Sequence, residues 1–249
     1  MDYFHSKRYL DTLPDWETGR PQLGSLHGYL PRMRRLLKRL GNPQVRFRTV
    51  IVGGSNGKGT VASLLAALLK ASGNTVGLYT QPHLHTVRER IQIQGAVVSR
   101  DGWAAATSFL YDQTREFERE GHGCFSKFEA VTALAAHLFT EANVEYGIFE
   151  VGLGGRFDAT NAWDSELAIL TEVALDHVEF LGDDLLSIAA DKVKIARSGH
   201  TLLTTPLQDP TVLDFLSAYC KRKQTHLQIA QNLDPEAEFR PERLQSPAE

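Results

Sequence analysis

The chain has 249 residues, of which 42% are hydrophobic and 23% are charged, and its formal net charge is −3. This composition is ordinary for a globular α/β protein and excludes a chain that is disordered throughout. The small net charge predicts no general attraction to nucleic acid or to a membrane surface, so any phosphate binding must come from a local site. The N-terminus lacks a secretory signal and no apolar run approaches bilayer length, so we expect a cytoplasmic location.

The N-terminal segment, residues 1–45, is predicted to be helical and to pack on the main domain. Between His27 and Leu40, leucine and methionine recur at helical spacing, and basic side chains fill the other face. From Phe47 onward, short β-branched or aromatic runs alternate with helical windows, which is typical of an α/β fold with a doubly wound, mostly parallel sheet and helices on both faces. We expect this domain to span residues 46–231, followed by a polar tail or truncated linker at 232–249.

The predicted elements alternate along the chain. The expected strands are 48–52, 75–80, 146–151, 167–173, 201–205 and 227–230, with a short extra strand within 89–95. The expected helices after the N-terminal segment are 58–71, 101–118, 127–142, 185–197 and 211–223.

A glycine-rich turn, Gly53-Gly54-Ser55-Asn56-Gly57-Lys58-Gly59-Thr60, links the first expected strand to the following helix. Such a turn points backbone N–H groups into one concavity, the helix N-terminus adds positive potential, and the lysine supplies a mobile cation. The strict P-loop pattern is missed twice, because Val52 replaces its first glycine and Gly59 separates Lys58 from a hydroxyl. We nevertheless predict a P-loop-like nucleotide site made by Asn56, Gly57, Lys58, Gly59 and Thr60.

The same turn admits two other interpretations. Gly53-Gly54-Ser55-Asn56-Gly57 also matches the nucleophile elbow of serine hydrolases, with Ser55 as the nucleophile. Against it, Lys58 has no role in an elbow, and Asp176 and His177 are adjacent, a poor arrangement for one side chain to orient the other. The plainest alternative is a glycine turn with an incidental surface lysine.

Polar side chains follow two further expected strands. Glu150 ends an apolar strand and meets a glycine loop, and the pair Asp176-His177 follows the strand at 167–173. The carboxyl ends of strands in open α/β sheets are where ligands bind. The alternatives are a surface carboxylate for Glu150 and a structural role for His177. From its position alone, Lys192 is an exposed helix lysine.

Five segments after the turn match one known family in order and spacing. They are Thr80-Gln81-Pro82-His83-Leu84, then Glu89-Arg90-Ile91, then residues 150–161 (EVGLGGRFDATN), then Leu175-Asp176-His177 with Leu181-Gly182, and Ile188-Ala189-Ala190-Asp191-Lys192. With the turn, they resemble the N-terminal ATP-binding domain of the folylpolyglutamate synthase and dihydrofolate synthase family, in the Mur ligase superfamily. The likeness begins near His27-Gly28-Tyr29-Leu30 and extends to about residue 230.

The resemblance implies an ATP-dependent amide-forming ligase. ATP would phosphorylate a carboxylate of dihydropteroate or a reduced folate, and the amino group of L-glutamate would attack the acyl phosphate. By the same resemblance, the catalytic residues would be Lys58, His177 and Lys192. Two magnesium ions would be held by Glu150, His177, Lys192 in carbamylated form, and Gln81. The substrate-binding residues would be His83, Arg90, Gly155, Arg156 and Asp158.

Three features depart from the family pattern. Gln81 stands where the family usually has a serine that ligates the first magnesium, although a glutamine carbonyl can also ligate this ion. Lys194 stands where the family typically has glycine. We also expect the family's C-terminal domain to be absent, so a second hypothesis is a catalytically impaired module that binds a nucleotide or a folate.

Overall fold

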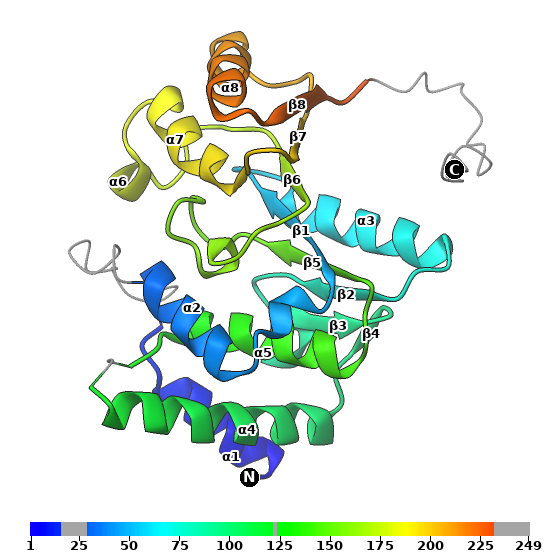
Figure 1. Cartoon of the computed structure of the whole chain (residues 1–249), viewed down its shortest axis with the longest axis vertical. Coiled ribbons are helices and arrows are strands. Elements are labelled where there is room, and N and C mark those ends of the chain that lie inside the picture. The colour runs from blue at the N-terminus through cyan, green and yellow to red at the C-terminus, as the bar shows by residue number, and fades with distance from the viewer. Residues whose placement is uncertain (16–28, 122–123, 232–249) are drawn as a thin grey trace.

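A computed structural model describes residues 1–15, 29–121 and 124–231, and these form an eight-stranded sheet between helices (Figure 1). The strand order is β4-β3-β2-β5-β1-β6-β7-β8. The strands are β1 (Arg48–Gly53), β2 (Val76–Tyr79), β3 (Ile91–Ile93), β4 (Ala96–Val97), β5 (Tyr146–Glu150), β6 (Leu167–Leu170), β7 (Thr201–Thr204) and β8 (His226–Ile229). All neighbouring pairs are parallel except β2–β3 and β3–β4. The predicted α/β class and mostly parallel sheet are confirmed.

The helices lie on both faces of the sheet. The α-helices are α1 (Tyr3–Thr12), α2 (Tyr29–Arg39), α3 (Lys58–Ala71), α4 (Arg100–Arg119), α5 (Lys127–Glu141), α6 (Val178–Leu181), α7 (Leu185–Lys192) and α8 (Pro210–Lys223). Short 3-10 helices are η2 (Pro43–Val45), η3 (Val87–Arg90), η4 (Ala159–Asn161) and η5 (Val193–Ile195). None of the described helices combines the length and apolarity needed to cross a bilayer.

The alternation of side chains along β1 divides the core. Val50 and Val52 pack in a cluster with α3, whereas Ile51, pointing the opposite way, packs with residues of α7 and α8. Phe149 of β5 is the register partner of Ile51 and lies on the same face of the sheet as Ile51. It packs in a larger cluster with α1, α2, α4 and α5. The sheet therefore has α3 on one face and two groups of helices on the other.

Strand β1 is the switch point of the sheet. It is hydrogen-bonded to β5 on one side and to β6 on the other, and both neighbours run parallel to it. Because parallel strands end at the same edge, the segments after Gly53, Glu150 and Leu170 leave the sheet side by side.

Most predicted boundaries agree with the structure, and the differences have local causes. The predicted helix 58–71 coincides with α3, and the extra strand within 89–95 is η3 followed by β3. The predicted helix 185–197 is too long, because α7 ends at Lys192 and η5 follows. The backbone becomes extended at Ala196, with ψ 142°, so the chain leaves the helix before Arg197. The helix start at His27 and the tail at 232–249 lie outside the described residues.

Two glycines let aromatic side chains reach the sheet. Gly77 on β2 and Gly147 on β5 are register partners. A Cβ at Gly77 would lie 2.5 Å from Cδ1 of Phe139, and one at Gly147 would lie 2.6 Å from Cε2 of Phe47. The rings of Phe47 and Phe139 are in edge contact, with centroids 5.9 Å apart.

We expect Gly77→Ala to lower the free energy of unfolding by about 1–3 kcal/mol, because its methyl group would overlap the fully buried ring of Phe139. Urea denaturation measures this change. Phe139→Leu makes room for the methyl group, so the double variant should lose less than the sum of the two single losses. Additive losses would show that the two residues do not compete for the same space.

Candidate functional site

The phosphate loop, residues 53–60, is held on the end of β6. Gly54 has φ 136°, and a Cβ there would collide with the side chain of Thr171. The Thr171 hydroxyl donates to the carbonyl oxygen of Asn56 at 2.7 Å. Gly57, with φ 77°, is the N-cap residue of α3 and has no side chain, so it provides no side-chain acceptor for the first N–H groups of the helix. The predicted strand, turn and helix are therefore present, with the geometry of an anion site.

Two lysine ammonium groups share one carbonyl of this loop. Lys58 Nζ donates to the oxygens of Gly54 and Ser55 at 3.1 and 3.0 Å, and Lys192 Nζ donates to the same Gly54 oxygen at 3.0 Å. Lys192 is 1% exposed, so its interpretation as an exposed helix lysine is wrong. Burial, and then the charge of Lys58, lower the pKa of Lys192, while Asp176 opposes this shift.

Asp176 joins Lys192 to His177. One carboxylate oxygen lies 3.5 Å from Lys192 Nζ, and the other lies 3.2 Å from Nε2 of His177. The sequence analysis treated this adjacent pair as a poor arrangement for one side chain to orient the other, yet the two side chains are in contact. His177 has φ 48°, a left-handed backbone that turns the chain at the start of α6, and its side chain is 49% exposed. Asp176 is a site residue that the sequence analysis named but did not place near Lys192.

Glu150 lies at the same edge of the sheet, against the first turn of α3. It is 4% exposed, and its Oε2 accepts the backbone N–H of Gln81 at 2.9 Å. A Cβ at Gly59 would lie 3.2 and 3.3 Å from the two carboxylate oxygens. Burial raises the pKa of Glu150, opposed by the N–H of Gln81, the charge of Lys58 and the N–H of Gly59. The surface-carboxylate alternative is therefore wrong.

Gln81 reaches the site through its backbone, and its side chain turns toward the glycine loop, residues 152–158. A Cβ at Gly152 would lie 2.8 Å from Nε2 of Gln81 and 3.1 Å from Oδ2 of Asp158. Within residues 1–15, 29–121 and 124–231, no three His, Cys, Asp or Glu side chains are grouped closely enough to hold a metal ion. The predicted metal set of Glu150, His177, Lys192 and Gln81 stays a prediction.

Asp158 shapes the glycine loop from inside. Its carboxylate accepts the N–H groups of Gly152, Leu153 and Thr160 at 2.9, 3.1 and 2.9 Å, and the Thr160 hydroxyl at 2.5 Å. Burial raises the pKa of Asp158, whereas these hydrogen bonds favour its charged form and oppose the shift. All the donors belong to its own loop and to η4, so the visible role of this residue is to position the loop.

The glycine loop packs directly on the end of α7. A Cβ at Gly155 would lie 2.7 Å from the carbonyl oxygen of Lys192, so only glycine permits this approach. Arg156 donates its backbone N–H to Oδ2 of Asp191 at 3.3 Å and exposes its side chain. In the loop after β2, the buried Arg90 donates from Nε to Nδ1 of His83 at 3.0 Å. The substrate contacts predicted for Gly155, Arg156, His83 and Arg90 stay predictions.

Ser55 does not have the surroundings of a nucleophile. Its hydroxyl donates to the carbonyl oxygen of Ala174 and accepts the N–H of the same residue, both at 3.0 Å. In the described chain, no hydrogen bond joins it to His177. The serine therefore fastens the phosphate loop to the segment after β6, and the hydrolase hypothesis has no base in place.

A glycine-rich strand-turn-helix loop at the switch point of a mostly parallel α/β sheet, with two lysines and a buried carboxylate beside it, is the arrangement of a P-loop-type α/β domain. No protein-family model matches the chain. A dihydrofolate synthase/folylpolyglutamate synthase of Bacillus subtilis is 36% identical over 194 residues, 78% of this chain and 45% of that relative. The chain belongs to the folylpolyglutamate synthase and dihydrofolate synthase family and matches the N-terminal part of its members.

Solved structures of the family have the same fold. A folylpolyglutamate synthase in complex with AMPPCP and folate superposes with a TM-score of 0.84 at 33% identity, over 92% of this chain and 54% of that one. The Mycobacterium tuberculosis folylpolyglutamate synthase complexed with ADP has a TM-score of 0.80 at 30% identity, over 91% and 50% of the two chains. The chain spans about half the length of the relatives it matches.

We expect Asp158→Ala to lower the free energy of unfolding by about 2–4 kcal/mol, because three backbone N–H groups and a hydroxyl would lose their acceptor. The measurement is urea denaturation followed by circular dichroism. The control is Asp164→Ala, which removes a carboxylate that is 83% exposed and pairs with Arg197, and should cost less than about 1 kcal/mol. Equal losses in the two variants would argue against the organising role of Asp158.

Proposed function

We propose that this chain supplies the ATP-binding half of a ligase that adds L-glutamate to dihydropteroate or a reduced folate. The observation that carries the proposal is the convergence of Lys58 and Lys192 on the Gly54 carbonyl, with Glu150 against the first turn of α3. Phosphoryl transfer depends mainly on positioning and charge neutralisation, and this group offers both. Relatives solved with AMPPCP and folate, or with ADP, support the choice of ligands.

The phosphates of ATP would lie over the phosphate loop. Residues 56–60 present N–H groups at the start of α3, and the Lys58 ammonium can leave the loop carbonyls for phosphate oxygens. A phosphoryl group would be transferred from ATP to a carboxylate of the acceptor, which would lie near Lys192. The glutamate amino group would then attack the carbonyl carbon of the acyl phosphate, forming the amide and releasing inorganic phosphate, with His177 and Asp176 nearby to accept the proton of the amine.

Some of the side chains at the site could serve as magnesium ligands. Glu150 supplies a hard oxygen ligand beside the phosphate loop, and the imidazole of His177 is exposed enough to join it. Lys192 cannot ligate a cation as an ammonium group, but a carbamate on it would add oxygen ligands. Its neutral amine is favoured by burial and by Lys58. Magnesium would neutralise phosphate charge when bound. Because Gln81 lies over Gly152, we propose that its side chain contacts the acceptor instead of the metal.

The acceptor would bind between the loop after β2 and the glycine loop. His83 and Arg90 come from the first, and Gly155, Arg156 and Asp158 from the second. Adenine, ribose and glutamate contacts would come from the part of the family fold beyond this chain. A cytoplasmic location stays a prediction.

We expect Lys58→Ala to weaken ATP binding about 10- to 100-fold, because a charge-assisted contact to phosphate is lost. Isothermal titration calorimetry of the chain with MgATP measures this affinity. The control is Lys70→Ala, which removes an exposed lysine at the far end of the same helix, bound to the carbonyl of Gln94. Ser55→Ala removes only the bonds to the Ala174 backbone, so it should lose less ATP affinity than Lys58→Ala. The hydrolase hypothesis demands instead that Ser55→Ala abolish an esterase activity of the chain.

The ligase itself is tested by the release of ADP. The chain, alone and mixed with the C-terminal part of the B. subtilis relative, receives MgATP, L-glutamate, and dihydropteroate or a reduced folate. Release that requires both glutamate and the acceptor supports the proposal. ATP binding without any such release in the mixture would favour the binding module instead.

We expect the chain to take up carbon dioxide on Lys192, and the uptake should rise with pH. The reacting form is the neutral amine, and its fraction grows as pH rises through a pKa lowered by burial and by Lys58, while Asp176 and Asp191 favour the charged form. The measurement is ¹³C NMR of protein equilibrated with ¹³C-bicarbonate at several pH values. Lys192→Gln should abolish the signal, and a signal that persists in this variant would contradict the assignment.

A further inference from the structure

A cleft lies at the opposite edge of the sheet from the phosphate loop, and the proposed reaction does not use it. Its volume is about 510 Å³, within the roughly 300–1,000 Å³ that is typical of small-molecule sites. Phe47 directly precedes β1 and Glu166 directly precedes β6, so the cleft lies at the amino ends of these strands. We call it the α2 cleft, and the residues that line it include Arg34, Lys38, Gln44, Phe47, Trp163 and Glu166.

The basic side of the α2 cleft comes from one face of α2. Arg34 and Lys38 are four residues apart, so they lie one above the other on adjacent turns. Nε of Arg34 donates to the carbonyl oxygen of Ala162 at 2.7 Å, which holds the guanidinium group at the cleft. Among the residues that the structure describes, neither Arg34 nor Lys38 has an ion-pair partner.

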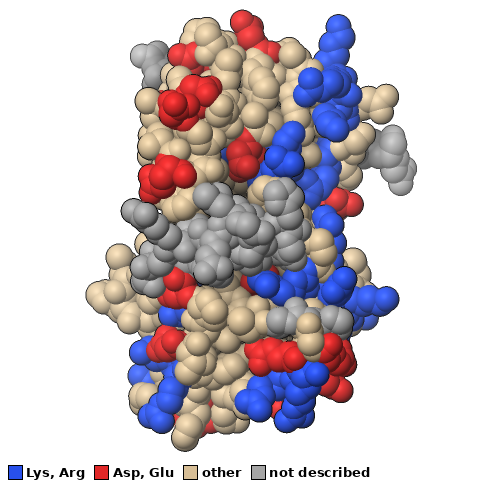
Figure 2. All heavy atoms as spheres, turned by 90° about the vertical axis from the view of Figure 1, so that its left-hand side faces the viewer, with Lys and Arg blue, Asp and Glu red and all other residues tan. Residues whose placement is uncertain are grey.

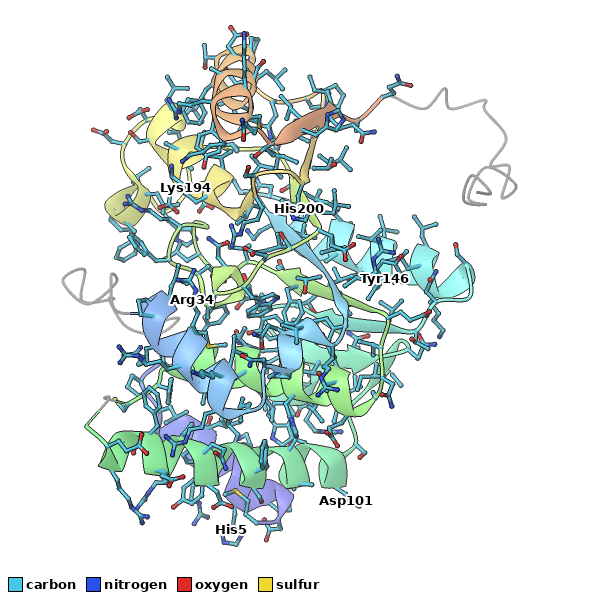
Figure 3. All side chains as sticks on the ribbon, viewed as in Figure 1. His5, Arg34, Asp101, Tyr146, Lys194 and His200 are labelled. Atoms are coloured by element: carbon cyan, nitrogen blue, oxygen red, sulfur yellow. The ribbon has the colours of Figure 1, made fainter. Side chains whose placement is uncertain are left out.

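The figures show where this basic side lies. Figure 3 labels Arg34 on α2, on the left of the molecule. Figure 2 views the molecule from that side, and lysine and arginine side chains gather there at mid-height on the right. The cations of α2 therefore belong to a face that is accessible to a charged ligand.

The carboxylates that line the α2 cleft already have partners. Oδ1 of Asp164 lies 2.7 Å from Nε of Arg197, and Oε2 of Glu166 lies 2.7 Å from Nε of Arg48. The cleft thus keeps two positive charges that no carboxylate pairs with, and these suit a dianionic group on a ligand. A phosphate monoester is such a group, because it carries a charge of about −1.5 to −2 at pH 7.

Two aromatic rings form the apolar part of the α2 cleft. Phe47 and Trp163 are each 9% exposed, and both pack on the buried Phe149, with ring centroids 6.0 and 5.1 Å from it. Nε1 of Trp163 donates to the hydroxyl of Thr49 at 3.0 Å, which fixes the indole ring. Fixed rings beside a guanidinium group favour a planar ligand ring, because such a ring can pack on both.

The α2 cleft also contains an amide group with an unmet hydrogen bond. In the part of the chain that the structure describes, Oε1 of Gln44 is enclosed by protein and accepts no hydrogen bond. Its Nε2 makes only a long contact, 3.5 Å, to Oδ1 of Asn42. Leaving a buried carbonyl unpaired costs free energy. A ligand N–H group that draws the Gln44 side chain into the cleft would supply the missing donor.

We infer that the α2 cleft binds a nucleoside monophosphate. Its phosphate contacts Arg34 and Lys38. Its base lies against Phe47 and Trp163, and an N–H group of the base donates to Gln44. Inorganic phosphate would leave the rings and the amide unused, and an uncharged nucleoside would leave the two cations unused. The inference does not depend on the proposed function, because the α2 cleft and the phosphate loop lie at opposite ends of β1.

The test is isothermal titration calorimetry of the chain with UMP, AMP, ribose 5-phosphate and uridine. Both nucleotides should bind at least about 10-fold more tightly than ribose 5-phosphate, which lacks the base, and than uridine, which lacks the phosphate. The affinity for the nucleotides should fall as salt is raised, because Arg34 and Lys38 are exposed to solvent.

Variants of the lining residues test each contact. Arg34→Gln with Lys38→Gln should weaken UMP binding about 10- to 100-fold, and Lys38→Gln alone about 3- to 10-fold. Gln44→Leu should weaken it about 3- to 10-fold without lowering the melting temperature, since the Gln44 carbonyl has no hydrogen bond to lose. The control, Arg115→Gln with Arg119→Gln, removes two exposed cations four residues apart on α4 and should change UMP affinity less than about twofold.

Trp163 reports the position of the bound base. UMP should change the tryptophan fluorescence of the chain, and Trp163→Phe should remove this change. Lys58→Ala should bind UMP as the wild type does. Loss of UMP binding in Lys58→Ala, with full binding in the Arg34 and Lys38 double variant, would assign the nucleotide to the phosphate loop and overturn the inference.

Three other results would also overturn the inference. The first is that the wild-type chain binds neither nucleotide. The second is that ribose 5-phosphate binds as tightly as UMP, which would show a site for anions only. The third is that the control on α4 weakens UMP binding as much as the double variant on α2. Thermal unfolding of each variant confirms that its fold is intact, and Lys38→Gln, which removes no hydrogen bond or ion pair of the described chain, keeps the test valid if Arg34→Gln disturbs the fold.

Discussion

The hydrogen bonding of β1 to parallel neighbours on both sides is the constraint on which the site depends. Because β5, β1 and β6 end at one edge, the phosphate loop, Glu150 and the segment with Asp176 and His177 leave the sheet together. At this edge, Lys192 of α7 donates to the carbonyl oxygen of Gly54, 138 positions earlier in the chain, which also accepts from Lys58. No single segment of the chain could assemble this group alone.

Close backbone approaches keep these segments in register. Gly54 fits against Thr171, and Gly155 fits against the carbonyl of Lys192, at separations that leave no space for a side chain. Asp158 and Ser55 serve the same end with hydrogen bonds to loop backbone. Several polar residues near the site thus act by positioning loops.

Buried ionisable side chains distinguish the site from the exposed basic residues near it. Lys192 and Glu150 are each nearly inaccessible to solvent. Burial lowers the pKa of Lys192 and raises the pKa of Glu150, so it favours the neutral form of both side chains. The side chains of Arg156, Arg222 and Lys223, in contrast, are exposed.

The sequence by itself determined the sheet class, the phosphate loop and most element boundaries, because hydrophobic periodicity and glycine turns are local signals. It also led to the family, through segments whose order and spacing are specific. It could not predict β4 or α6, which are too short to show periodicity. Only the tertiary structure decided that Lys192 is buried, that Asp176 contacts both Lys192 and His177, and that the Gln81 side chain lies over Gly152. These facts depend on how segments far apart in the sequence pack together, and the spacing of residues along the sequence does not specify that packing.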